Sequence, residues 1–234
     1  ALSSAASDVY KRQTYAMLEA AHMAKQQGID VVAGYVETHA RPKTAALLNG
    51  LEVLPTREVF YNGMILDEFD IGMALKRKPQ LILVDELAHT NAEGCRHAKR
   101  YQDIKELLNA GIDVYTTVNV QHIESLCDTV ASITEIVVRE RIPDSIFDNA
   151  DQVELIDIEP QDLINRMNTG NVYRQTQAKQ AVENFFTIEN LTALREISLR
   201  RCADRVNILT ENTRIKNHGD YHTGEHIPVS YTHL

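Results

Sequence analysis

The central part of the chain alternates short apolar runs with longer amphipathic stretches. Runs that are rich in β-branched residues and bounded by Gly, Pro or polar residues predict strands. They span Val31–Glu37, Leu81–Glu86, Asp113–Asn119 and Glu135–Glu140. Stretches with apolar residues three and four positions apart predict helices. They span Tyr15–Gln27, Arg41–Asn49, Asp67–Lys76, His97–Asn109 and Gln121–Ser132. Because the strands are too apolar to be half-solvated, we expect an α/β fold with a mostly parallel sheet and helices on both faces.

The pattern changes after the last of these runs. A further strand is predicted at Gln152–Ile158, and helices are predicted at Pro160–Asn168 and Gln175–Arg205. From about Asn207 the periodicity is lost and polar residues gather, as in a linker. We therefore expect an α/β domain over residues 14–158, a helical extension over 159–206 and a linker over 207–234.

The composition of the chain argues against several kinds of binding partner. The chain has 234 residues with 24 Lys and Arg against 33 Asp and Glu, so its net charge of −9 has the wrong sign for coating nucleic acid. No apolar run reaches the ~20 residues of a membrane span. The three cysteines lack the spacing of a zinc ribbon or disulfide framework. We expect no nucleic-acid partner, no membrane insertion of this segment and a cytoplasmic location.

Two carboxylates follow the most apolar run of the chain. Asp85 and Glu86 come directly after Leu81–Val84, so a buried strand delivers them to the carboxyl end of the sheet, where α/β proteins bind ligands. An Asp at this position can hold Mg²⁺, and a neighbouring Glu can orient a water molecule in nucleotide hydrolysis. The alternative is that the two residues only end the strand and cap the next element.

The loop after these carboxylates is rich in hydrogen-bond donors. Arg96, Lys99 and Arg100 form a tight basic cluster that suits phosphate oxygens or acidic groups of a neighbouring domain, although a solvated helix start explains it almost as well. His89, Cys95 and His97 do not have the spacing of a closed zinc site.

A nucleotide site of this type also needs a phosphate loop with the pattern G-x-x-x-x-G-K-[ST] before a helix. Thr14 supplies the final hydroxyl, but Gln13 stands at the Lys position, and Arg12 and Ser7 stand at the two Gly positions. Without Gly and Lys, the backbone cannot approach the phosphates closely and their charge loses its fixed counter-ion. The sequence therefore predicts a broken phosphate cradle.

Several long motifs occur along the chain: TYAMLEAAH at 14–22, GYVETH at 34–39, LILVDELAHTN at 81–91, RHAKRYQD at 96–103, DVYTTVNVQH at 113–122, ENFF at 183–186 and NLTALRE at 190–196. Together they resemble the N-terminal cytoplasmic domain of one family, the KdpD osmosensitive potassium sensor histidine kinases. The resemblance covers roughly residues 14–210. It implies a P-loop NTPase-like fold that binds ATP and Mg²⁺ and precedes a universal-stress-type domain, membrane spans and a kinase core.

The resemblance also implies roles for single residues. Asp85 and Glu86 match the second ATP motif, and Thr14 matches the last residue of the first, with Thr14 and Asp85 as the expected Mg²⁺ ligands. We add Arg96 and Asn119 as further candidates for nucleotide contact. We expect this chain to bind ATP and Mg²⁺ weakly or not at all, because residues 1–13 read as a non-native leader and the first strand is degraded or missing.

The resemblance sets the expected partners and activity. The parent protein would be a protein-histidine kinase of a two-component system that controls potassium transport, anchored in the inner or plasma membrane. This fragment lacks the kinase core, so we expect no catalytic residue in it and no activity alone. Its partners would be the other domains of the kinase and, indirectly, a response regulator. The alternative is a module that binds no nucleotide and docks neighbouring kinase domains.

Overall fold

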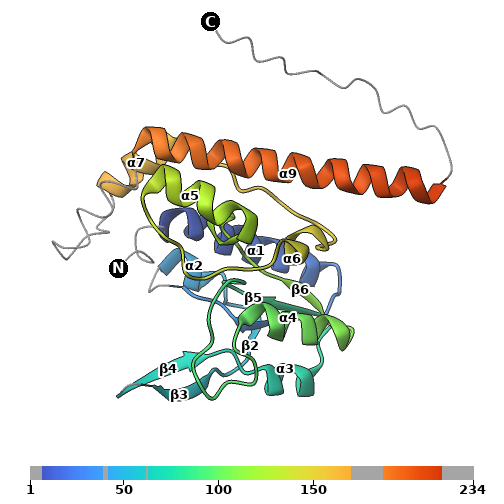
Figure 1. Cartoon of the computed structure of the whole chain (residues 1–234). Coiled ribbons are helices and arrows are strands. Elements are labelled where there is room, and N and C mark those ends of the chain that lie inside the picture. Colours follow the sequence, from blue (N-terminus) through green and yellow to red (C-terminus); the bar gives the residue numbers. More distant parts are fainter. Residues whose placement is uncertain (1–6, 39–41, 62, 170–186, 218–234) are drawn as a thin grey trace, which may run out of the picture.

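A parallel sheet forms the centre of the computed structural model, which describes residues 7–38, 42–61, 63–169 and 187–217 (Figure 1). Its four strands lie in the order β2, β1, β5, β6. They are β1 (Val31–Tyr35), β2 (Glu52–Val53), β5 (Leu81–Val84) and β6 (Asp113–Tyr115). All three pairings are parallel, which confirms the predicted α/β class and three of the predicted strands.

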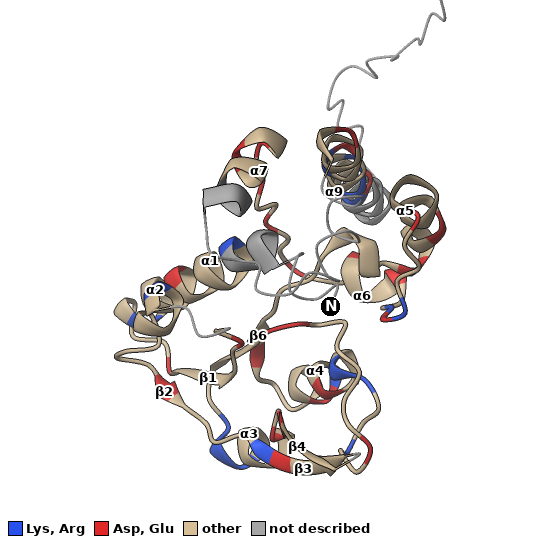
Figure 2. Cartoon of the chain, turned by 90° about the vertical axis from the view of Figure 1, so that its left-hand side faces the viewer, with Lys and Arg blue, Asp and Glu red and all other residues tan. Residues whose placement is uncertain are grey.

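Helices cover both faces of the sheet because successive residues of a buried strand point to opposite sides. Val31, Ala33, Leu81 and Leu83 pack with α1 (Ser7–Gln26) in one apolar cluster. Val32, Ile82 and Val84 pack in a second cluster with residues of α3 (Ile71–Arg77) and α4 (Arg100–Asn109). The two layers lie on either side of the strands in Figure 2. Each fully buried aliphatic side chain contributes about 2 kcal/mol, so this alternation fixes the register of the central strands.

A β-hairpin, which the sequence analysis missed, stands beside the sheet. Strands β3 (Arg57–Tyr61) and β4 (Met64–Glu68) pair antiparallel. The predicted helix Asp67–Lys76 was wrong at its start, because Asp67 and Glu68 belong to β4. Helix α3 begins at Ile71, where the Asp70 carboxylate accepts a hydrogen bond from the Met73 N–H at 3.0 Å. The dipeptide Asn62-Gly63 is a strong hairpin signal, and Gly63 adopts a φ of 83°.

The two predicted strands beyond β6 were wrong. Residues 135–140 form no strand, and the chain there follows α5 (Cys127–Thr134), which ends at Glu135 in a left-handed conformation. Two 3₁₀ turns, η1 (Val120–His122) and η2 (Glu124–Leu126), precede α5, so the predicted helix Gln121–Ser132 starts later than expected. Residues 152–158 also form no strand. Among the described residues β6 is the edge strand of the sheet, so neither segment pairs with its free edge.

The first helix starts earlier than the sequence pattern indicated. Residues 7–13 are the first two turns of α1, so they do not form a central strand, as we expected. The rest of the expected leader, residues 1–6, lies outside the described residues. Helix α2 (Pro42–Ala46) is a shorter form of the predicted helix Arg41–Asn49, and α4 starts at Arg100 instead of His97.

The C-terminal part of the described chain is helical. Helix α7 (Pro160–Thr169) confirms one predicted helix, and α9 (Ile188–Asn217) runs past the predicted end at Arg205. The loss of periodicity from Asn207 therefore does not end the helix. Arg201 anchors α9 to α6 (Asp144–Asp148) through an ion pair of 2.5 Å with Asp148. Residues 175–186 of the predicted helix and 218–234 of the predicted linker lie outside the described residues.

Candidate functional site

Thr14 and Asp85 meet at the carboxyl end of the central strand β5. The Thr14 Oγ1 donates a hydrogen bond of 2.8 Å to the Asp85 Oδ2 across 71 residues of sequence. Thr14 is 4% exposed and Asp85 is 2% exposed. Asp85 directly follows β5, and Thr14 lies on the helix that covers one face of the sheet. The expected proximity of these two residues is confirmed.

The chain surrounds the Asp85 carboxylate with donors. The Thr117 hydroxyl, from the segment after β6, donates to Oδ1, and the Glu86 N–H donates to the same oxygen at 3.1 Å. Burial raises the pKa of Asp85, whereas the hydrogen bonds from Thr117 and Thr14 lower it. Charge-assisted hydrogen bonds of this kind contribute about 1.5–3 kcal/mol each, so the donors offset part of the penalty for burying the charge.

Glu86 adopts an unusual backbone conformation beside Asp85. Its φ of 59° lies in the left-handed region, which costs a residue with a Cβ about 1–3 kcal/mol. This conformation turns its N–H toward Asp85 Oδ1 and toward the Thr117 Oγ1, 3.3 Å away. Burial and the charge of Asp85 raise the pKa of Glu86, and its side chain is 30% exposed. Glu86 is therefore the solvent-accessible carboxylate of the pair.

A buried ionic network connects this strand end with the hairpin. Arg100 is fully buried and donates from Nη1 to the Asp85 carbonyl oxygen at 3.2 Å and from Nη2 to Glu68 Oε2 at 3.0 Å. Its guanidinium also lies 4.0 Å from the centre of the Tyr35 ring. Burial raises the pKa of Tyr35 to about 12. Arg100, expected in a basic cluster for phosphates, is thus an internal residue.

Glu68 accepts hydrogen bonds from other residues besides Arg100. It accepts hydrogen bonds from His89 Nε2 at 3.1 Å and from the Ala92 N–H at 2.9 Å. Burial alone would raise the pKa of Glu68, but His89, the Ala92 N–H and Arg100 together hold that pKa below its ordinary value. The sequence pattern predicts a helix at Glu68, so it does not indicate that Glu68 faces the loop after β5.

Asn119, a candidate for nucleotide contact, is 8% exposed, and its side-chain oxygen has no hydrogen-bond partner in the described part of the chain. Gln13, at the position of the expected Lys, donates from Nε2 to the Val118 carbonyl oxygen at 3.0 Å. This hydrogen bond joins α1 to the segment after β6. Gln13 directly precedes Thr14, and Val118 directly precedes Asn119.

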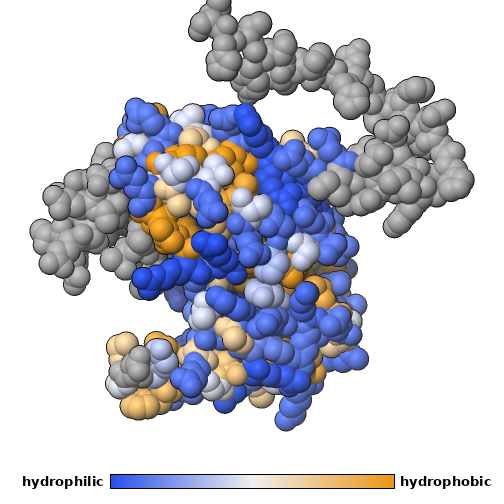
Figure 3. All heavy atoms as spheres, viewed as in Figure 1, coloured by the Kyte–Doolittle hydropathy of each residue, from blue (hydrophilic) through white to orange (hydrophobic). Residues whose placement is uncertain are grey.

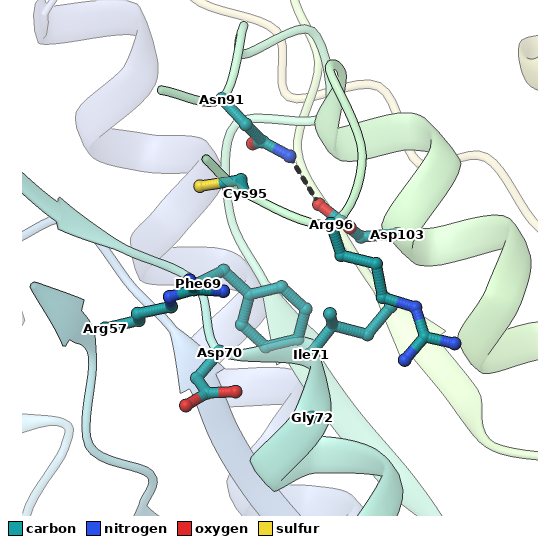
Figure 4. A pocket seen from close by; sticks show the side chains of 9 residues that line it. All are labelled: Arg57, Phe69, Asp70, Ile71, Gly72, Asn91, Cys95, Arg96 and Asp103. Atoms are coloured by element: carbon teal, nitrogen blue, oxygen red, sulfur yellow. Dashed lines mark hydrogen bonds between the residues drawn. The ribbon is translucent and has the colours of Figure 1, made fainter. Parts of the chain in front are cut away.

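Arg96 lies apart from the Thr14 and Asp85 pair. Its guanidinium forms an ion pair of 2.5 Å with Glu106, and it borders a separate cavity of about 150 Å³. The cavity is lined by Arg57, Phe69, Asp70, Ile71, Gly72, Asn91, Cys95, Arg96 and Asp103 (Figure 4). The Asn91 amide donates to Asp103 Oδ2 at 2.7 Å, and the Arg96 guanidinium extends away from this pair.

The three loop residues considered for zinc do not converge on one point. His89 binds Glu68, whereas His97 binds Glu106 at 2.7 Å. Burial raises the pKa of the Cys95 thiol, which disfavours the thiolate form that binds metals. No cluster of three or more His, Cys, Asp or Glu side chains suited to a metal occurs among the described residues.

The residues before Thr14 do not fit the phosphates of ATP. A phosphate loop presents free backbone N–H groups, but in an α-helix that begins at Ser7 the N–H groups from Lys11 onward are bonded within the helix. The Gln13 amide is neutral and already bonded to the Val118 carbonyl. The Thr14 hydroxyl and the Asp85 carboxylate are oxygen groups of the kind that Mg²⁺ binds, whereas the helical residues before Thr14 do not form a phosphate loop.

Comparison with known proteins agrees with the motifs. Residues 5–206 match the family model KdpD, described as the osmosensitive K⁺ channel His kinase sensor domain. We expected the resemblance to begin at Thr14, but the match begins at residue 5. No helix of the described residues has both the length and the apolar character of a membrane span.

The chain is also similar to curated relatives named "Sensor protein KdpD". It is 60% identical over 203 residues to that of Clostridium acetobutylicum, which covers 87% of this chain and 23% of the relative. It is 57% identical over 194 residues to that of Escherichia coli K12, with 83% and 22% covered. The chain therefore spans less than a quarter of the length of these relatives. On the family match and these identities, the chain belongs to the KdpD family of sensor kinase domains.

Proposed function

We propose that this chain is a regulatory, cytoplasmic ATP-site domain of a KdpD-type sensor kinase in a two-component system that controls potassium transport. The site keeps its metal side and has lost its phosphate side. The observation that carries the proposal is the buried hydrogen bond of 2.8 Å between Thr14 and Asp85. In nucleotide-binding proteins with a phosphate loop, a Ser or Thr hydroxyl and a strand-end Asp hold Mg²⁺ together. Thr14 supplies such a hydroxyl from within α1, which begins at Ser7.

The missing phosphate side sets the expected affinity. Each charge-assisted hydrogen bond contributes about 1.5–3 kcal/mol, so the loss of the Lys and of part of the backbone cradle amounts to several kcal/mol. At ~1.4 kcal/mol for each factor of ten, a micromolar site becomes millimolar or weaker. We therefore expect this chain to bind no ATP at micromolar concentrations.

Isothermal titration of ATP with Mg²⁺ into two proteins tests the proposal. The first is this chain, and the second carries an apolar strand and a G-x-x-x-x-G-K loop in place of residues 1–13. The first should show no heat of binding, and the second should bind ATP. Micromolar affinity in the unrepaired chain that Asp85→Ala abolishes would show that residues 1–13 do hold phosphate. A repaired chain that folds but stays silent would contradict the ATP site itself.

One observation favours the second candidate function, a module that docks other kinase domains without nucleotide. Both oxygens of the Asp85 carboxylate already accept hydrogen bonds from the chain itself, from Thr14 and Thr117. A silent repaired chain that still binds the remaining domains of its kinase would favour this function. In either case the response regulator is reached only through the kinase core, and we expect no autophosphorylation by this chain.

A further inference from the structure

The β3–β4 hairpin exposes large apolar side chains away from its base. Phe60 is 76% exposed and Ile65 is 64% exposed, and they are direct cross-strand partners. Met64 and Tyr61, the next pair, are 61% and 40% exposed. The hairpin projects from the body of the protein in Figure 1, and Figure 3 shows hydrophobic surface on this projection. Exposed apolar side chains gathered in this way mark an interaction site.

Two acidic residues lie beside apolar residues on one face of this hairpin. Residues two positions apart on a strand share a face, so Glu58 and Asp67 lie on the same face as Phe60 and Ile65. Glu58 and Asp67 are themselves cross-strand partners, and both are exposed. Two like charges directly opposite each other destabilise a hairpin unless a cation lies near them. We call Glu58, Phe60, Ile65 and Asp67 the acidic apolar face.

Charge argues against a second copy as the occupant of this face. Two copies face to face would place Glu58 and Asp67 against the same two carboxylates of the other copy. Each copy also carries a net charge of −9, which opposes self-association. The same repulsion disfavours an anionic membrane surface as the occupant.

We propose that the acidic apolar face binds a basic amphipathic segment of another domain or protein. Such a segment places two apolar side chains against Phe60 and Ile65 and a Lys or Arg near Glu58 and Asp67. This inference goes beyond the proposed function and does not depend on ATP. The hairpin is connected to the ATP-site strand, because Glu68 at the end of β4 holds Arg100, which binds the Asp85 carbonyl oxygen.

Peptide binding to the full chain tests this inference. The probes are two fluorescent helical peptides, one of repeated Leu-Lys-Lys-Leu-Leu-Lys-Leu and one with Glu in place of Lys, measured by anisotropy. The basic peptide should bind at least about tenfold tighter than the acidic one. Phe60→Ser with Ile65→Ser should weaken it about tenfold. Glu58→Lys with Asp67→Lys should weaken the basic peptide and strengthen the acidic one.

A charge-matched control excludes a general electrostatic effect. Asp151 and Glu154 are exposed acidic residues outside the hairpin, so Asp151→Lys with Glu154→Lys changes the net charge equally. This variant should retain its affinity for the basic peptide within about threefold. An equal loss in the control variant, or no preference for the basic peptide, would overturn the proposal. So would a dimer in sedimentation that Phe60→Ser with Ile65→Ser dissolves, because the occupant would then be a second copy.

Discussion

Replacing Arg100 by Met removes the cation from the buried network behind Asp85. Glu68, whose side chain is 4% exposed, then keeps a buried charge without its guanidinium partner. Breaking a buried ion pair from one side costs about 3–5 kcal/mol. The Met also removes the Arg100 Nε, a buried donor without a partner in the described part of the chain, which returns about 1 kcal/mol. We therefore expect the free energy of unfolding to fall by about 3 kcal/mol.

Urea denaturation followed by circular dichroism measures this loss. With a slope of about 2 kcal/mol per molar urea, the midpoint should fall by roughly 1.5 M. Arg96→Met is the matched control, because Arg96 pairs with Glu106 at 2.5 Å but its side chain is 54% exposed. A surface ion pair contributes at most about 1 kcal/mol.

Adding Glu68→Gln to Arg100→Met separates the cost of the buried Glu68 charge from the other effects of losing Arg100. In Arg100→Met with Glu68→Gln, the Gln carbonyl can still accept from His89 and Ala92, and neither position of the pair carries a buried charge. The double variant should regain more than half of the lost stability. A loss in Arg100→Met no larger than in Arg96→Met, or no recovery in the double variant, would refute the reasoning.

Two further predictions concern pH and packing. The pKa of Glu68 lies below its ordinary 4.5, so its ionised form stabilises the fold above pH 4.5 and this contribution is lost as the pH falls through the folded-state pKa. Glu68→Gln should therefore flatten the fall of the urea midpoint below pH 4.5, and an unchanged slope would contradict this. A Cβ on Gly34 would lie 2.7 Å from Ile82 and 2.9 Å from Phe69, so Gly34→Ala should cost about 1–3 kcal/mol in urea melts. At Gly72 the nearest contact is the Asp70 carboxylate at 3.2 Å, which is looser than the contacts at Gly34, so Gly72→Ala should change stability by less than about 1 kcal/mol. Equal losses at both positions would exclude the steric explanation.

The central strands could be predicted because a strand that is buried on both faces has apolar residues at consecutive positions. Leu81–Val84 is apolar at every position, and all four side chains are buried. The meeting of Thr14 and Asp85 followed from the family resemblance, because helix, and not a strand, precedes Thr14 in the described chain. The residue types and the family motifs were sufficient for this part of the site.

Other features depend on partners that a local pattern does not reveal. Residues 135–140 have the β-branched composition of a strand, yet they do not pair with the free edge of β6. Arg100 has the same sequence signature as the exposed Arg96, and only burial against Glu68 distinguishes them. The hairpin was missed because the helical spacing of Asp67–Lys76 outweighed the Asn62-Gly63 signal.

The Mg²⁺ dependence of ATP binding by the repaired chain tests the central claim most directly. If Thr14 and Asp85 are the metal side of the site, Mg²⁺ should tighten ATP binding by at least about tenfold. Asp85→Asn in the repaired chain should remove that dependence and leave metal-free ATP binding unchanged. Equal affinities with and without Mg²⁺, or a Mg²⁺ effect that survives Asp85→Asn, would contradict the account.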